Sequence, residues 1–80
     1  MEDASRILVV DDDAGIRDVL GDYLSQHGFI AYQAASAREM DDVLAATQID
    51  LIVLDMMMPG EDGLSVCRRM GGKGAPILML

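Results

Sequence analysis

Two short apolar runs in this chain each end in aspartate. Ile-Leu-Val-Val at residues 7–10 precedes Asp11, and Leu-Ile-Val-Leu at residues 51–54 precedes Asp55. An apolar run of this length, bounded by polar and turn-forming residues, is typical of a strand buried on both faces. Open α/β sheets place their ligand crevices at the carboxyl ends of such strands. If the two strands are parallel neighbours, several acids converge on one small surface.

The remaining sequence predicts an alternation of helices and strands. Two further strands are expected at residues 29–34 and 76–80. Apolar residues at helical spacing follow each of the first three strands and predict three helices. These residues are Ile16, Val19, Leu20, Tyr23 and Leu24, then Met40, Val43 and Leu44, then Leu64, Cys67 and Met70. The order β-α-β-α-β-α-β favours an α/β fold with a parallel sheet and right-handed helical crossovers.

Local signals mark where these helices begin and end. Gly28 suits a left-handed stop after the first helix. Ser36 and Glu39 form a capping-box pattern before the second helix. The third helix is expected to begin near Gly63 and to end at the glycine-rich residues 71–74. Eighty residues without a linker or a repeat make one domain, residues 1–80.

Composition argues against several classes of function. A formal net charge of -8 and a pI near 4.2 disfavour direct binding to nucleic acid or to an anionic membrane. The one cysteine, Cys67, excludes an internal disulfide and fits a reducing compartment. No stretch resembles a secretory signal or reaches the length of a membrane span. We therefore expect a cytoplasmic location.

Three acids carry the predicted chemistry: Asp11, Asp12 and Asp55. Oxygen ligands without a nearby His or Cys suit a hard cation, Mg²⁺ rather than Zn²⁺. Such a cation also offsets the repulsion between acids held close together. A carboxylate left free in this kind of site can attack a phosphoryl group and become an aspartyl phosphate. Asp13 is interpreted instead as a helix-capping acid.

Two motifs together resemble the receiver domain of two-component response regulators. The first is the strand-like run that ends in Asp11-Asp12-Asp13. The second runs from Leu54 to Gly63, Leu-Asp-Met-Met-Met-Pro-Gly-Glu-Asp-Gly. Either motif alone is weak, but their combination is specific, and the similarity extends from about Arg6 to Leu80. The resemblance implies a flavodoxin-like parallel sheet, with strand order 2-1-3-4-5 in an intact domain and helices on both faces.

The resemblance also implies a role for each acid. Asp55 would accept a phosphoryl group from a histidine kinase or a phosphotransfer protein. Asp12 and Asp55 would bind Mg²⁺ directly, the backbone carbonyl of Met57 would be a third ligand, and Asp11 would act largely through water. Such a domain is a phosphoacceptor rather than an enzyme, although intact relatives assist their own phosphorylation and dephosphorylation.

By this resemblance the chain is a truncated receiver, because it ends inside the fourth strand. Receivers carry a Ser or Thr after that strand and a Lys after a fifth strand, and both contact the phosphoryl group. We therefore expect phosphorylation of Asp55 to be impaired. Absence of the last helix should also leave apolar surface of the first and third strands bare, beside an open strand edge. A homodimer through that edge or face is expected.

Two other functions fit parts of the sequence. Asp11-x-Asp13 resembles the start of a haloacid-dehalogenase-type phosphatase, but Gly15 stands where that motif has Thr or Val, and the Asp55 segment stays unexplained. The second alternative is a receiver-like interaction module that no longer handles phosphate. A soft-metal site at Met56-Met57-Met58 lacks other sulfur ligands, so these residues are interpreted as loop and core packing.

Overall fold

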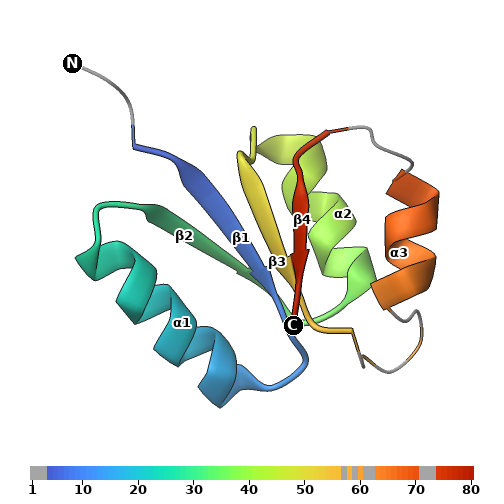
Figure 1. Ribbon diagram of the computed structural model, residues 1–80, viewed down its shortest axis with the longest axis horizontal. Coiled ribbons are helices and arrows are strands. Elements are labelled where there is room, and N and C mark those ends of the chain that lie inside the picture. The colour runs from blue at the N-terminus through green and yellow to red at the C-terminus, as the bar shows by residue number, and fades with distance from the viewer. Residues whose placement is uncertain (1–3, 57, 59, 61–62, 71–73) are drawn as a thin grey trace.

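The chain folds into a parallel sheet with a helix between successive strands (Figure 1). The computed structural model describes residues 4–56, 58, 60, 63–70 and 74–80. The element order is β1 (Arg6–Val10), α1 (Ala14–Gln26), β2 (Ile30–Ala34), α2 (Ala37–Ala46), β3 (Leu51–Leu54), α3 (Gly63–Met70) and β4 (Ile77–Met79). The predicted alternation is confirmed. None of the helices described has both the length and the apolar character needed to cross a membrane.

The strands lie in the order β2-β1-β3-β4, and every neighbouring pair is parallel. β1 is central, because Val10 pairs with Ala34 of β2 on one side and with Leu54 of β3 on the other. This arrangement confirms the predicted order for these four strands. Since β1 and β3 are adjacent and parallel, the residues that follow them emerge at the same edge of the sheet.

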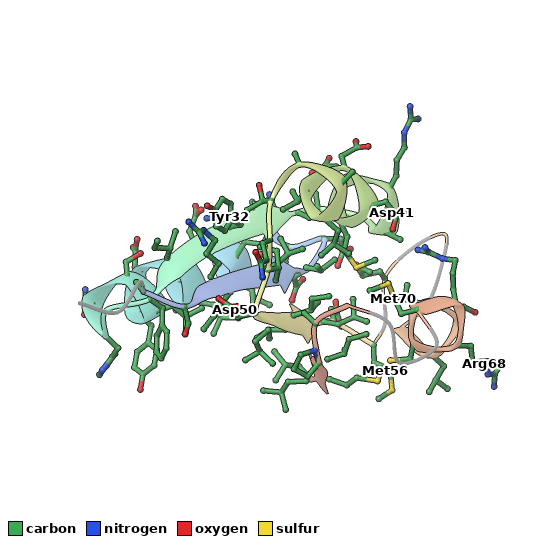
Figure 2. All side chains as sticks on the ribbon, turned by 90° about the horizontal axis from the view of Figure 1, so that it is seen from above. Tyr32, Asp41, Asp50, Met56, Arg68 and Met70 are labelled. Atoms are coloured by element: carbon green, nitrogen blue, oxygen red, sulfur yellow. The ribbon has the colours of Figure 1, made fainter. Side chains whose placement is uncertain are left out.

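One face of the sheet is covered by α2 and α3. The buried cluster on this face includes Leu8, Val10, Ile52, Leu54, Met40 and Val66. Figure 2 shows Met70 pointing from α3 toward α2, whereas the exposed Arg68 points away from the core. Each large apolar side chain buried here stabilises the fold by roughly 1.5–3 kcal/mol relative to an exposed one. This cluster holds β1 and β3 in place at the centre of the sheet.

The opposite face of the sheet is covered by α1, beside β2. A Cβ added at Gly21, the buried residue of α1, would lie 3.2 Å from Gln33 Nε2 and 4.0 Å from Ala31 Cβ. These two β2 residues pair with Val9 and Ile7, which are the alternate set of β1 residues. Helices therefore lie on both faces, as predicted, and Figure 1 shows α1 on the β2 side and α3 on the β4 side.

The predicted helix caps are present. Asp13 is the N-cap of α1, and Gly28 after this helix has a φ of 86°, the left-handed conformation that glycine favours. The Ser36 hydroxyl accepts a hydrogen bond from the Glu39 amide at 3.2 Å. The Glu39 carboxylate accepts a hydrogen bond from the Ala35 amide at 2.9 Å, one residue earlier than a capping box requires.

The prediction of bare apolar surface on the first and third strands is wrong. Ile7, Val9 and Val53 are only 4%, 1% and 9% exposed. For Ile7 and Val9 the reason is that α1 packs against β1 as well as β2, so it covers the central strand itself. Exposed apolar side chains lie on α1 and at β4, at Ile16, Val19, Tyr23, Leu78 and Leu80, and also at Phe29, Ile30, Met56 and Leu64.

Candidate metal and phosphoacceptor site

The carboxyl ends of β1 and β3 bring aspartates together at one edge of the sheet. Val10 and Leu54 are the last residues paired between these strands, so Asp11 and Asp55 come next on each. The Asp55 amide donates to the Val10 carbonyl at 2.9 Å, and the Asp11 amide donates to the Ala34 carbonyl at 3.1 Å. Sheet-like hydrogen bonds therefore hold the backbone of both aspartates.

The loop after β1 gives its three acids different surroundings. Asp11 is 6% exposed, and its Oδ1 accepts a hydrogen bond from the Asp13 amide at 2.9 Å. Asp12, between them, is exposed. The Asp13 Oδ1 accepts hydrogen bonds from the amides of Gly15 and Ile16 at 2.8 and 3.2 Å. This carboxylate caps α1, as predicted, so Asp11 and Asp12 are the acids that the loop offers to a ligand.

Gly63 allows α3 to start close behind Asp55. A Cβ at this position would lie 2.8 Å from Met56 Cα and 3.3 Å from the Asp55 carbonyl oxygen. The Gly63 amide donates to the Met56 carbonyl at 3.0 Å, which closes the turn. Gly60 has a φ of 89°, a conformation that glycine adopts without strain. The start of α3 is thus hydrogen-bonded to the residue that follows Asp55.

The three predicted acids form one cluster. One carboxylate oxygen from each of Asp11, Asp12 and Asp55 lies within 4.8 Å of the other two. Two unit charges at this separation repel by about 1 kcal/mol in water, and by about 3.5 kcal/mol at an effective dielectric constant of 20. A divalent cation between them converts this repulsion into attraction.

The cluster fits the requirements of Mg²⁺. This ion takes oxygen ligands at about 2.1 Å in octahedral geometry, so the oxygens bound to it lie about 3 to 4.2 Å apart. The carboxylate oxygens of the cluster lie within 4.8 Å of one another, which is close to this range. An all-oxygen ligand set also selects a hard cation over Zn²⁺. Met57, whose backbone carbonyl the resemblance adds to the ligands, lies outside the described residues.

Arg17 is a residue near the site that the sequence analysis overlooked. Its Nη1 donates to the Asp11 carbonyl at 2.7 Å, and its Nε donates to Gln33 Oε1 on β2 at 3.3 Å. Its sequence position does indicate a place near the acid loop. Arg17 is four residues after the N-cap, and helical side chains lean toward the N-terminus of their helix. The contact with β2 could not be anticipated, since it depends on how α1 packs on the sheet.

This fold and this acid cluster define a flavodoxin-like domain of the receiver class. The four strands have the order of such a domain, and the acids lie at the carboxyl edge. A family model described as response regulator receiver domain matches residues 7–80. The match covers nearly the whole sequence, so the chain belongs to the response regulator receiver domain family.

Curated relatives support this membership. Response regulator MprA of Mycolicibacterium vanbaalenii and response regulator MprA of Mycobacterium tuberculosis are each 47% identical to the chain over 77 residues. The alignments cover 94% of this chain, but 33% and 34% of the two relatives. The chain therefore spans about a third of the length of these relatives.

Solved structures share the fold. The N-terminal domain of a response regulator receiver protein from Methanoculleus marisnigri is 37% identical, with a TM-score of 0.86 over 92% of this chain and 63% of that one. Response regulator TrrA from Thermotoga maritima, solved in complex with Mg²⁺-BeF, is 35% identical. Its TM-score is 0.84 over 94% of this chain and 67% of that one.

Proposed function

We propose that this chain is a phospho-accepting domain of two-component signalling, in which Asp55 takes the phosphoryl group in a Mg²⁺-dependent reaction. The observation that carries the proposal is the cluster of carboxylate oxygens from Asp11, Asp12 and Asp55 within 4.8 Å of one another. Asp55 follows β3 directly, its amide donates to the Val10 carbonyl at 2.9 Å, and the residue is partly exposed. The Mg²⁺-BeF complex of TrrA supports the choice of cation.

The proposed step is a transfer between two side chains. A carboxylate oxygen of Asp55 attacks the phosphorus of a phosphohistidine on the donor protein. A phosphorus–oxygen bond forms, the phosphorus–nitrogen bond breaks, and the imidazole leaves with the electron pair. By the resemblance, Asp12, Asp55 and the Met57 carbonyl would hold Mg²⁺ directly, and Asp11 would act largely through water. When bound, Mg²⁺ offsets negative charge on the phosphoryl oxygens.

The proposed donor is a histidine kinase or a phosphotransfer protein. The net charge of -8 gives these residues no attraction for the phosphates of nucleic acid, which favours a protein partner. A cytoplasmic location is proposed because the one cysteine, the half-buried Cys67, suits a reducing compartment. Residues 1–80 are proposed to belong to one receiver domain.

A second copy of the chain is the proposed partner for the exposed apolar surface. A hollow of about 570 Å³ lies between α1 and the end of β4, lined by Asp13, Gly15, Ile16, Val19, Leu20 and Leu80. Val19 and Leu80 are 69% and 61% exposed. Among the described strands, β4 is also an edge strand, with backbone groups available for pairing. Apolar surface beside an open edge favours a homodimer.

Intact-mass spectrometry after incubation with acetyl phosphate and Mg²⁺ tests the phosphoacceptor role. We expect one phosphoryl adduct on the parent chain. No adduct should form when EDTA is present during the incubation, and none should form on Asp55→Asn. Asp18→Asn is the matched control, because it removes an equal charge from an exposed position on α1 and should keep the adduct. An adduct on Asp55→Asn would contradict the proposal. A parent chain that forms no adduct would favour the alternative of a receiver-like interaction module that no longer handles phosphate.

A further inference from the structure

Arg17 joins three parts of the fold beside the acid cluster. It lies near the start of α1 and is half-buried. Its Nη1 is 2.7 Å from the Asp11 carbonyl oxygen, and its Nε is 3.3 Å from Gln33 Oε1. Gln33 belongs to β2, where it pairs with Val9 of β1. One guanidinium group therefore links α1, the acid loop and the sheet.

The contacts of Arg17 lie on both sides of Asp12. Its side chain donates to the carbonyl of Asp11, and its backbone amide donates to the carbonyl of Asp13 at 3.1 Å. Asp11 is held further by the hydrogen bond that its amide donates to the Ala34 carbonyl, and Asp13 by its role as the N-cap of α1. Asp12 itself is exposed and lies between the two residues whose carbonyls Arg17 contacts.

We propose that Arg17 is a positioning residue for the metal site. By fixing the Asp11 carbonyl, its guanidinium keeps the Asp12 carboxylate within reach of the same cation as Asp11 and Asp55. This inference rests on the proposed function, because it gives Arg17 a task in the Mg²⁺ site of a phosphoacceptor. The planar guanidinium suits the task because its donors have fixed directions, and Gln33 accepts one of them and so orients the plane.

The charge of Arg17 makes the proposal sharply testable. A positive charge beside the acid cluster repels Mg²⁺, so its removal would tighten Mg²⁺ binding if electrostatics alone acted. Loss of positioning has the opposite effect, because Asp12 must then be ordered when the ion binds. The direction of the change in Mg²⁺ affinity therefore decides between the two effects.

The first experiment measures Mg²⁺ affinity of the folded 80-residue chain by calorimetry, with the amide NMR shifts of Asp12 and Asp55 as the site-specific readout. Arg17→Met should raise the dissociation constant roughly tenfold, the equivalent of one charge-assisted hydrogen bond of about 1.4 kcal/mol. Arg38→Met is the matched control, because it removes the same charge from an exposed position on α2 and should stay within about twofold of the parent. Mg²⁺ binding to Arg17→Met that equals or exceeds that of the parent would overturn the proposal.

A second variant covers the case in which Arg17→Met does not fold. Gln33→Met leaves every charge in place and removes only the acceptor that orients the guanidinium, and Gln33 is an exposed residue. We expect its Mg²⁺ dissociation constant to rise about threefold, less than for Arg17→Met, because the hydrogen bond from Arg17 to the Asp11 carbonyl stays in place. An unchanged dissociation constant for a folded Gln33→Met would count against the proposal.

A phosphorylation assay distinguishes failure of the Arg17 proposal from failure of the proposed phosphoacceptor function. With acetyl phosphate, Arg17→Met should need more Mg²⁺ than the parent for half-maximal adduct, yet reach the same adduct level at saturating Mg²⁺. A parent that is phosphorylated on Asp55, together with an Arg17→Met that has an unchanged Mg²⁺ requirement, would remove the inference and leave the function standing. A parent that binds no Mg²⁺ and takes no phosphate would remove both.

Discussion

Position 63 leaves no room for a side chain behind Asp55. A Cβ there would lie 2.7 Å from Met79 Cε and 2.8 Å from Met56 Cα. The methionine side chain can move, but the backbone that carries Asp55 can move only by distorting the end of β3. Position 63 is therefore where the start of α3 and the acid cluster constrain each other.

Gly63→Ala is expected to destabilise the fold and to disturb the site. The clash with the Met56 backbone should lower the free energy of unfolding by about 1–3 kcal/mol, the usual cost of overpacking. Urea unfolding followed by circular dichroism measures the change. Leu64→Ala is the control, because Leu64 is 52% exposed on the same helical turn and should change the free energy by about 0.5 kcal/mol or less. Equal stability of Gly63→Ala and the parent would show that the backbone yields freely.

Neighbouring aspartates in the first loop should respond differently to substitution. Asp12→Asn removes a charged ligand and should raise the Mg²⁺ dissociation constant at least about tenfold. Asp13→Ser keeps an N-cap oxygen, so both its free energy of unfolding and its Mg²⁺ affinity should stay close to those of the parent. Calorimetry and urea unfolding measure the two quantities. A large loss of Mg²⁺ affinity in Asp13→Ser would make Asp13 a ligand rather than a cap.

The helices and strands were largely predictable because their signals are local. The apolar runs at residues 7–10 and 51–54, the spacing of the helical stripes and the caps at Asp13, Gly28 and Ser36 all act within a few residues. The convergence of Asp11, Asp12 and Asp55 also followed, because adjacent parallel strands end at one edge of the sheet.

Contacts between distant elements were not predictable in the same way. The Arg17–Gln33 hydrogen bond joins residues 16 apart in the sequence, and it forms only because α1 packs on β2. Periodicity shows that α1 has an apolar stripe, but not which part of that stripe the sheet covers. For this reason the sequence predicts bare apolar surface on the first and third strands, whereas the most exposed apolar side chains include Val19 of α1 and Leu80 after β4.

The 80-residue chain is expected to form a homodimer in solution. Sedimentation velocity should show a dimer at high protein concentration. Val19→Lys should shift it toward monomer, because Val19 is 69% exposed and lines the hollow between α1 and β4. Leu64→Lys adds the same charge at another exposed apolar position and should leave the dimer intact. A folded parent that stays monomeric at high concentration would refute the homodimer.

The most direct test of the shared cation site uses Mn²⁺ as a paramagnetic probe. Mn²⁺ prefers the same octahedral oxygen ligands as Mg²⁺, and it broadens the NMR signals of nearby nuclei. At low Mn²⁺ the amide signals of residues 11–13 and 55–56 should disappear first, and excess Mg²⁺ should restore them. In Asp12→Asn and in Asp55→Asn, the amide signals of residues 11–13 and 55–56 should no longer disappear at low Mn²⁺. Broadening spread evenly over exposed acids such as Asp41 and Asp50, with no preference for residues 11–13 and 55–56, would contradict a site built by the ends of β1 and β3.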